Sequence, residues 1–105
     1  MVITFEDKDL EELLARHGNR RYKKYTRDIL FLDSLDRVFD RLSSALNTQQ
    51  LRQYSYLHYE QLKGTNGLSS VRVMNGRIER LIFREIDDGI EIQMLEMNND
   101  HYGKE

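Results

Sequence analysis

Two dipeptides that favour tight turns, Asn75-Gly76 and Asp88-Gly89, place the strongest limit on the folds open to this chain. Both dipeptides tolerate the positive φ angles that short β-hairpin turns require. The segments beside them are rich in β-branched and other apolar residues, which predicts three consecutive antiparallel strands. The expected strands are about Ser69–Met74, Ile78–Ile86 and Ile90–Glu96.

The first half of the chain predicts one strand followed by two helices. Val2–Phe5 has the alternating apolar positions of a short strand. Asp7 is suited to cap a helix that Gly18 closes, and the apolar stripe of that helix is Leu10, Leu13 and Leu14. A longer second helix is predicted by apolar residues at helical spacing. These residues are Leu32, Leu35, Val38, Phe39, Leu42, Ala45 and Leu46.

The stretch Thr48–Gln61 is polar and aromatic without a regular period, so we interpret it as a loop with at most one helical turn. The expected order of elements is therefore β-α-α-β-β-β. This order predicts an α+β fold in which a small antiparallel sheet carries the two N-terminal helices on one face.

The composition limits the kinds of site that the chain can hold. Its 105 residues include no cysteine, which excludes a disulfide framework and a zinc–thiolate site. The three histidines are far apart, so we expect neither a metal nor a cofactor. No apolar run is long enough for a membrane span, and no secretion signal is visible. We expect a single soluble, cytoplasmic domain over residues 1–105.

The charges are unevenly distributed along the chain. The net charge is −2, yet residues 16–84 contain 14 Lys or Arg against 6 Asp or Glu, and both flanking segments are acidic. A basic central region favours a polyanionic partner such as a nucleic acid. The alternative is that these charges only solvate the faces of helices and strands.

Cations are expected to gather on one face of the sheet. Side chains alternate along a strand, which places Arg72 and Arg80 on the face away from the helices, and Lys63 lies in the loop that enters the sheet. Three converging cations repel one another unless an anion lies between them, and guanidinium matches phosphate oxygens in pairs. The alternative is cross-strand pairing with glutamates. These glutamates are Glu79, Glu85 and Glu91.

Proton-transfer residues are available near these cations. Asp100, His101 and Tyr102 follow the last strand and can fold beside the arginine face. Cleavage of RNA by its own 2′-OH needs a base, an acid and cations for the phosphorane. Glu60 or His101 can transfer protons, whereas Tyr102 can donate a proton or stack on a base. The alternative is that His101 is simply exposed to solvent. Further candidates for substrate contact are His58, Arg77, Arg84 and Asp100.

Several short motifs follow one another over about residues 58–102. They are Leu62-Lys63-Gly64, Ser70-Val71-Arg72-Val73, Asn75-Gly76, Arg80-Leu81-Ile82-Phe83, an Asp-Gly hairpin and Asp100-His101-Tyr102. In this order and spacing they resemble the toxins of the RelE/ParE superfamily, and most closely its HigB-like branch of plasmid maintenance killer proteins. The expected strand-helix-helix order before them is also similar to that family.

The resemblance implies a toxin of a type II toxin–antitoxin system. Such a protein is a ribosome-dependent mRNA endonuclease that works by 2′-OH attack without a metal, and a cognate antitoxin, often a helix-turn-helix protein, silences it. Lys63, Arg72 and Arg80 stand at the positions of the family's phosphate-contacting and transition-state residues.

The chain departs from the branch at three places. Glu60 stands where the branch has a histidine, His101 and Tyr102 stand in exchanged order, and Met74 is an added residue. The base and the acid therefore remain open among Glu60, His101 and Tyr102. Two other functions also remain open: a ParE-like inhibitor of DNA gyrase, and a non-catalytic module whose arginine face holds an acidic peptide.

Overall fold

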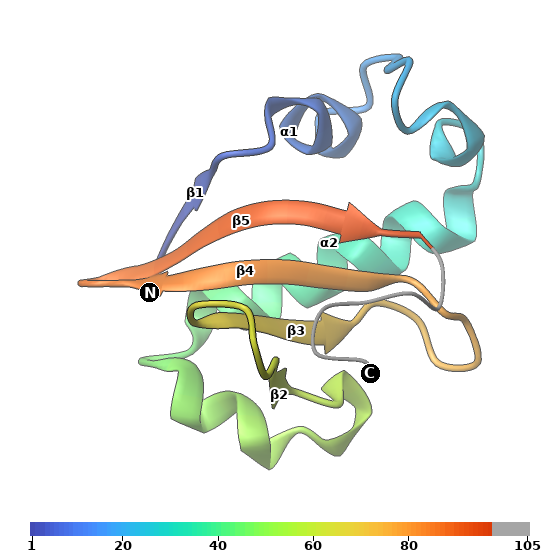
Figure 1. The fold of residues 1–105 in the computed structure, drawn as a ribbon. Coiled ribbons are helices and arrows are strands. Elements are labelled where there is room, and N and C mark those ends of the chain that lie inside the picture. Colours follow the sequence, from blue (N-terminus) through green and yellow to red (C-terminus); the bar gives the residue numbers. More distant parts are fainter. Residues whose placement is uncertain (98–105) are drawn as a thin grey trace.

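The computed structural model describes residues 1–97, in which five strands form one sheet in the order β1-β5-β4-β3-β2 (Figure 1). The strands are β1 (Val2–Phe5), β2 (Glu60–Gln61), β3 (Leu68–Arg72), β4 (Arg80–Ile86) and β5 (Gly89–Glu96). Two α-helices, α1 (Lys8–Leu14) and α2 (Ile29–Ser44), pack on one face of the sheet. Three short 3-10 helices also occur: η1 (Lys23–Tyr25), η2 (Thr48–Gln53) and η3 (Ser55–Leu57).

The α+β class is confirmed, but the predicted sheet is wrong in two respects. β1 pairs in parallel with β5, so the sheet is mixed rather than antiparallel. In addition, β2 pairs with β3, so the expected β-α-α-β-β-β order omits one strand. Neither feature follows from a local pattern, because β2 has only two residues and alternation within a strand does not identify its neighbour.

The two turn glycines serve different purposes. Gly76 has a φ of 84°, as the Asn75-Gly76 turn predicts, although β4 begins at Arg80 rather than at Ile78. At Gly89 the requirement is space, because a Cβ there would lie 1.8 Å from the backbone oxygen of Val2. The glycine thus allows β1 to lie against β5.

Helix α1 begins as predicted and ends earlier than predicted. The Asp7 carboxylate caps it by accepting from the N–H of Leu10 at 3.2 Å. The helix closes at Arg16, not at Gly18: Arg16 has a φ of 65°, and the N–H of His17 bonds to a carbonyl one turn earlier. The Arg16 guanidinium then pairs with Asp36 at 2.8 Å, which ties α1 to α2.

Helix α2 supplies most of the helical side of the core. Its N-cap is Asp28, which accepts from the N–H of Phe31 at 3.2 Å. Leu46 was expected in the apolar stripe but is 78% exposed, because the chain leaves the helix after Ser44.

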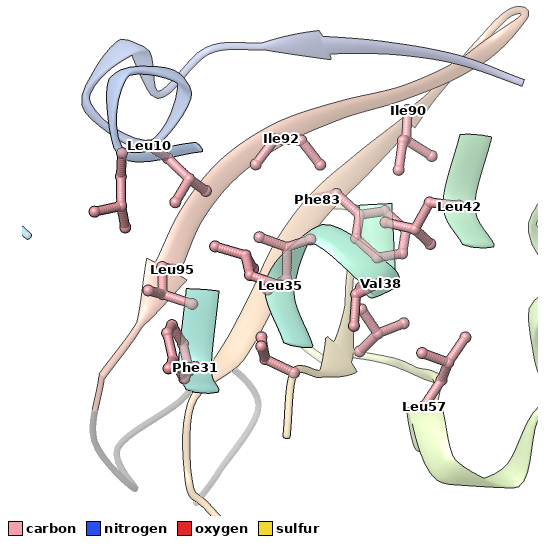
Figure 2. Packing of buried hydrophobic residues seen from close by; sticks show 14 of the residues in the cluster. Leu10, Phe31, Leu35, Val38, Leu42, Leu57, Phe83, Ile90, Ile92 and Leu95 are labelled. Atoms are coloured by element: carbon pink, nitrogen blue, oxygen red, sulfur yellow. The ribbon is translucent and has the colours of Figure 1, made fainter. Parts of the chain in front are cut away.

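The core lies between the helices and one face of the sheet (Figure 2). Burial of each large side chain there stabilises the fold by about 1.5–3 kcal/mol. A register shift in β5 pairs Ile82 with Met94 but Phe83 with Ile92. This bulge lets Ile92 and Leu95 both face the core, although their separation is odd.

The connector between the helices is held by two buried tyrosines, which the sequence analysis did not place in the core. The Tyr22 hydroxyl donates to Asp7 and accepts from the N–H of Leu95 at 3.2 Å. The Tyr25 hydroxyl donates to Glu79 at 2.9 Å. Burial and the adjoining carboxylates raise the pKa of both tyrosines above its usual value, so both stay protonated donors.

Arg77 completes the second of these networks. Its guanidinium contacts Asp28 at 2.9 Å and Glu79 at 2.9 Å and lies 4.8 Å from the Phe31 ring centroid. The network thereby links the N-terminus of α2, the connector and the β3–β4 hairpin. Arg77 was a candidate for substrate contact, but the structure gives it this structural role.

Replacement of Tyr25 by Phe should lower the free energy of unfolding by roughly 1–3 kcal/mol, because the buried Glu79 carboxylate loses a donor. Urea denaturation measures this change. Tyr59→Phe is the matched control, since the Tyr59 hydroxyl has no hydrogen-bond partner within residues 1–97. Equal stability of the two variants would contradict the structural role of the network.

The network also predicts acid sensitivity. A hydrogen bond from Arg77 lowers the pKa of Asp28. Burial alone would raise the pKa of Glu79. Hydrogen bonds from Arg77, from its own backbone and from Tyr25 outweigh burial, so the pKa of Glu79 is lowered as well. The two carboxylates stabilise the fold fully above their pKa values in the unfolded chain, which are about 4. This stabilisation is lost as the pH falls through their lower pKa values in the folded protein. Denaturation below about pH 4.5 should therefore show a steeper loss of stability for wild type than for Glu79→Gln. Parallel pH profiles would contradict this linkage.

Candidate functional site

Arg72 and Arg80 lie directly opposite each other on β3 and β4. Their neighbours Val71 and Leu81 belong to the helix-side core, so both arginines belong to the other face of the sheet. The predicted sharing of one face is therefore confirmed. The register, not a loop, brings these two guanidinium groups together.

Arg80 is held by two side chains, one from β2 and one from β3. Its guanidinium lies 3.0 Å from a Glu60 carboxylate oxygen of β2 and donates to the Ser70 hydroxyl of β3 at 2.8 Å. Its side chain is 12% exposed, whereas that of Glu60 is 46% exposed. A largely buried cation thus has a solvent-accessible carboxylate beside it.

Arg72 has a different environment from Arg80. Its side chain makes no hydrogen bond or ion pair with any part of the chain that the structure describes, and its Nε is buried. A buried N–H without a partner costs free energy, and the like charge of Arg80 on the facing strand adds to that cost. An anion bound between the two guanidinium groups would remove both costs.

A small apolar cluster lies on the same face of the sheet as this arginine pair. Leu62, Leu68 and Ile82 are buried together, and Met94 packs against them. Surroundings of low polarity strengthen the interaction between a guanidinium group and an anion.

The pairing of β2 with β3 brings Glu60 to the site, because Glu60 faces Ser70 in the register. Two residues at this site were missed by the sequence analysis. Ser70 has the same parity as Arg72 along β3, so alternation could have revealed it. Glu96 is buried and faces Arg80 from β5, but the bulge in β5 obscured its side of the sheet.

The glutamates expected as alternative partners bind elsewhere. Glu79 pairs with Arg77, Glu85 accepts from the Thr48 hydroxyl, and Glu91 accepts from Gln93. Glu60 is the carboxylate that pairs with Arg80. The expected cross-strand neutralisation by Glu79, Glu85 and Glu91 is therefore wrong for Arg72 and Arg80.

Within residues 1–97, no hydrogen bond or ion pair joins the other candidate residues to the arginine pair. Lys63 is exposed in the loop between β2 and β3, and Arg84 donates to the backbone oxygen of Asn66. His58 is exposed at the end of η3 with a φ of 48°. The remaining candidates lie outside the described residues. These are Asp100, His101 and Tyr102.

Comparisons with protein-family models, with curated proteins and with solved structures find no match to this chain. No helix within residues 1–97 has both the length and the apolar character that a membrane crossing needs. The same residues contain no group of three or more His, Asp or Glu side chains placed to hold a metal ion.

Because Arg72 has a buried Nε without a partner in the described residues, its substitution should not destabilise the fold. Arg72→Met should leave the free energy of unfolding unchanged or raise it by about 1 kcal/mol, because it removes an unpartnered buried N–H and a like charge. Arg77→Met is the matched control in the same hairpin, and it should lower stability by roughly 1–3 kcal/mol because buried Glu79 loses its partner. Denaturation of both variants in urea tests this pair, and a larger loss of stability for Arg72→Met would contradict an unpartnered, destabilising Arg72.

Proposed function

We propose that this protein is an RNA-cleaving toxin that cuts mRNA on the ribosome and is silenced by a cognate antitoxin. The observation that carries the proposal is the facing pair Arg72 and Arg80 with the Glu60 carboxylate 3.0 Å from Arg80. The motif resemblance to the RelE/ParE toxins supplies the substrate class.

The reaction is an attack of the RNA on itself. Glu60 accepts the proton of the 2′-OH, and the 2′-oxygen then forms a bond to the phosphorus. The bond from phosphorus to the 5′-oxygen breaks, and a general acid gives that oxygen a proton. The products are a 2′,3′-cyclic phosphate and a 5′-hydroxyl, and no metal takes part.

The arginine pair would supply the electrostatic part of catalysis. Negative charge grows on the phosphorane oxygens, and donors already fixed in place stabilise that charge without reorganisation. Ser70 fixes the Arg80 guanidinium at 2.8 Å. An incoming phosphate would replace Glu60 on Arg80, which would release the carboxylate to take up the proton.

Three residues are candidates for the general acid. His101 and Tyr102 keep their predicted roles as proton donor, with stacking on a base as a second role for Tyr102. Glu96 is a third candidate, because it faces Arg80 across β4 and β5. Lys63, in the loop next to Leu62, adds positive charge for the substrate.

Replacement of Arg80 by Ala should slow single-turnover cleavage of ribosome-bound mRNA by about 100–1000-fold, the usual cost of one preorganised donor. Arg80→Lys should restore only part of the rate, because ammonium lacks the two-pronged guanidinium geometry. Arg27→Ala, at an exposed arginine, is the control and should cleave at the wild-type rate.

Three results would count against the proposal. Cleavage that survives Arg80→Ala unchanged would remove Arg80 from the mechanism. Inhibition of DNA gyrase by a wild type that leaves mRNA intact would favour a ParE-like function. Binding of an acidic peptide through Arg80, without either activity, would make the arginine face a docking surface.

A further inference from the structure

A groove of about 670 Å³ lies between α2 and the end of β3, away from the arginine pair. Helix α2 forms one wall, Tyr56 of η3 a second, and the chain just after β3 closes the groove. The residues that matter for its chemistry are Arg37, Asp40, Arg41, Tyr56, Met74 and Asn75.

Two cations in the groove lack an acidic partner. Arg37 and Arg41 are exposed and form no ion pair with any part of the chain that the structure describes. Among residues 1–97, the Arg37 guanidinium donates a hydrogen bond only to the Ser34 hydroxyl, at 3.4 Å. Asp40 also lines the groove but pairs with neither arginine, so these three side chains leave one net positive charge.

An aromatic ring stands beside these cations in a fixed orientation. Tyr56 is 52% exposed, and its hydroxyl accepts from Arg41 Nε at 3.1 Å. Arg41 in turn lies 4.5 Å from the centroid of the Tyr54 ring. A half-exposed, oriented ring next to unpaired guanidinium groups suits a ligand that joins a planar ring to an anion.

The apolar lining is too small for a partner helix. Val38 and Val73 are only 4% and 6% exposed, so the accessible apolar surface is essentially the Tyr56 ring and Met74. A docked helix needs a row of apolar anchors along several turns. A nucleotide needs one ring surface and one cationic site, and Asp40 and Asn75 can bond to the edge of a base.

We propose that this groove binds one nucleotide of single-stranded RNA, with its phosphate between Arg37 and Arg41 and its base on Tyr56. The identity of the ligand as RNA rests on the proposed function. The groove is close to the cleavage site along the chain, since Met74 follows Arg72 by two residues, or about 7 Å of extended chain. An RNA strand bound at both places would pass around the end of β3.

Fluorescence anisotropy with a labelled single-stranded 2′-O-methyl decanucleotide tests this site, because that probe cannot be cleaved by 2′-OH attack. Tyr56→Ala should weaken binding by roughly 5- to 100-fold, and Tyr56→Phe should bind nearly as wild type because the ring remains. The double variant Arg37→Ala/Arg41→Ala should also bind more weakly. For this double variant, the slope of log affinity against log salt concentration should be shallower by about 0.7 per lost phosphate contact. Tyr56→Ala should leave that slope unchanged.

The control variant Arg20→Ala/Arg27→Ala removes two exposed arginines from before α2 and should keep the wild-type affinity. If the groove variants bind as tightly as this control, the proposal is overturned. Amide NMR shifts on titration of the wild type give an independent test. Shifts at Tyr56, Met74 and Asn75 support the site, and shifts confined to other elements reject it.

The outcome is separable from that of the cleavage experiment. Arg80→Ala removes one phosphate contact outside the groove, so it should weaken binding of the decanucleotide less than Arg37→Ala/Arg41→Ala does. A loss of cleavage with binding that still depends on Tyr56 supports both proposals. Binding through the groove by a protein that never cleaves RNA supports the groove alone. If the wild-type protein does not bind the decanucleotide but binds a glutamate-rich peptide through Arg37 and Arg41, the proposal of an RNA-binding groove is overturned.

Discussion

The register between β3 and β4 is the constraint on which the rest of the structure depends. Val71 and Leu81 fill the core on one face, and the same pairing sets Arg72 opposite Arg80 on the other. A slip of one residue by either strand would turn the arginine of that strand into the core and its apolar neighbour to the opposite face. Burial on the helix side thus fixes the geometry of the cations, and β2 then brings Glu60 to Arg80.

Two buried polar networks position the helices over that sheet. Tyr22 and Tyr25 each donate to a buried carboxylate, Asp7 and Glu79 respectively. One carboxylate also caps α1, and the other binds Arg77 of the β3–β4 hairpin. The basic connector therefore contributes two side chains to the core, Tyr22 and Tyr25, while its cations stay exposed. Helix α2 is thereby placed where it forms a wall of the Arg37 and Arg41 groove.

The sequence predicted features that depend on local periodicity and missed those that depend on distant pairing. Alternation and turn residues placed three strands, the apolar stripe placed α2, and parity placed Arg72 and Arg80 on one face. The parallel partner of β1, the bulge in β5 and the roles of Tyr22 and Tyr25 all require knowledge of tertiary neighbours. Within the site, Glu60 was found through its motif position and Ser70 shares the parity of Arg72, whereas the position of Glu96 opposite Arg80 follows only from the register of the bulged strand β5.

In the proposed reaction, Arg72, Arg80 and Glu60 promote attack by a 2′-OH on the adjoining phosphodiester. The most direct measurement is mass spectrometry of the ends that the wild-type protein produces on ribosome-bound mRNA. Attack by the 2′-OH should leave a 2′,3′-cyclic phosphate on one fragment and a 5′-hydroxyl on the other. Fragments with a 5′-phosphate, which require water as the nucleophile, or an mRNA left intact would contradict it.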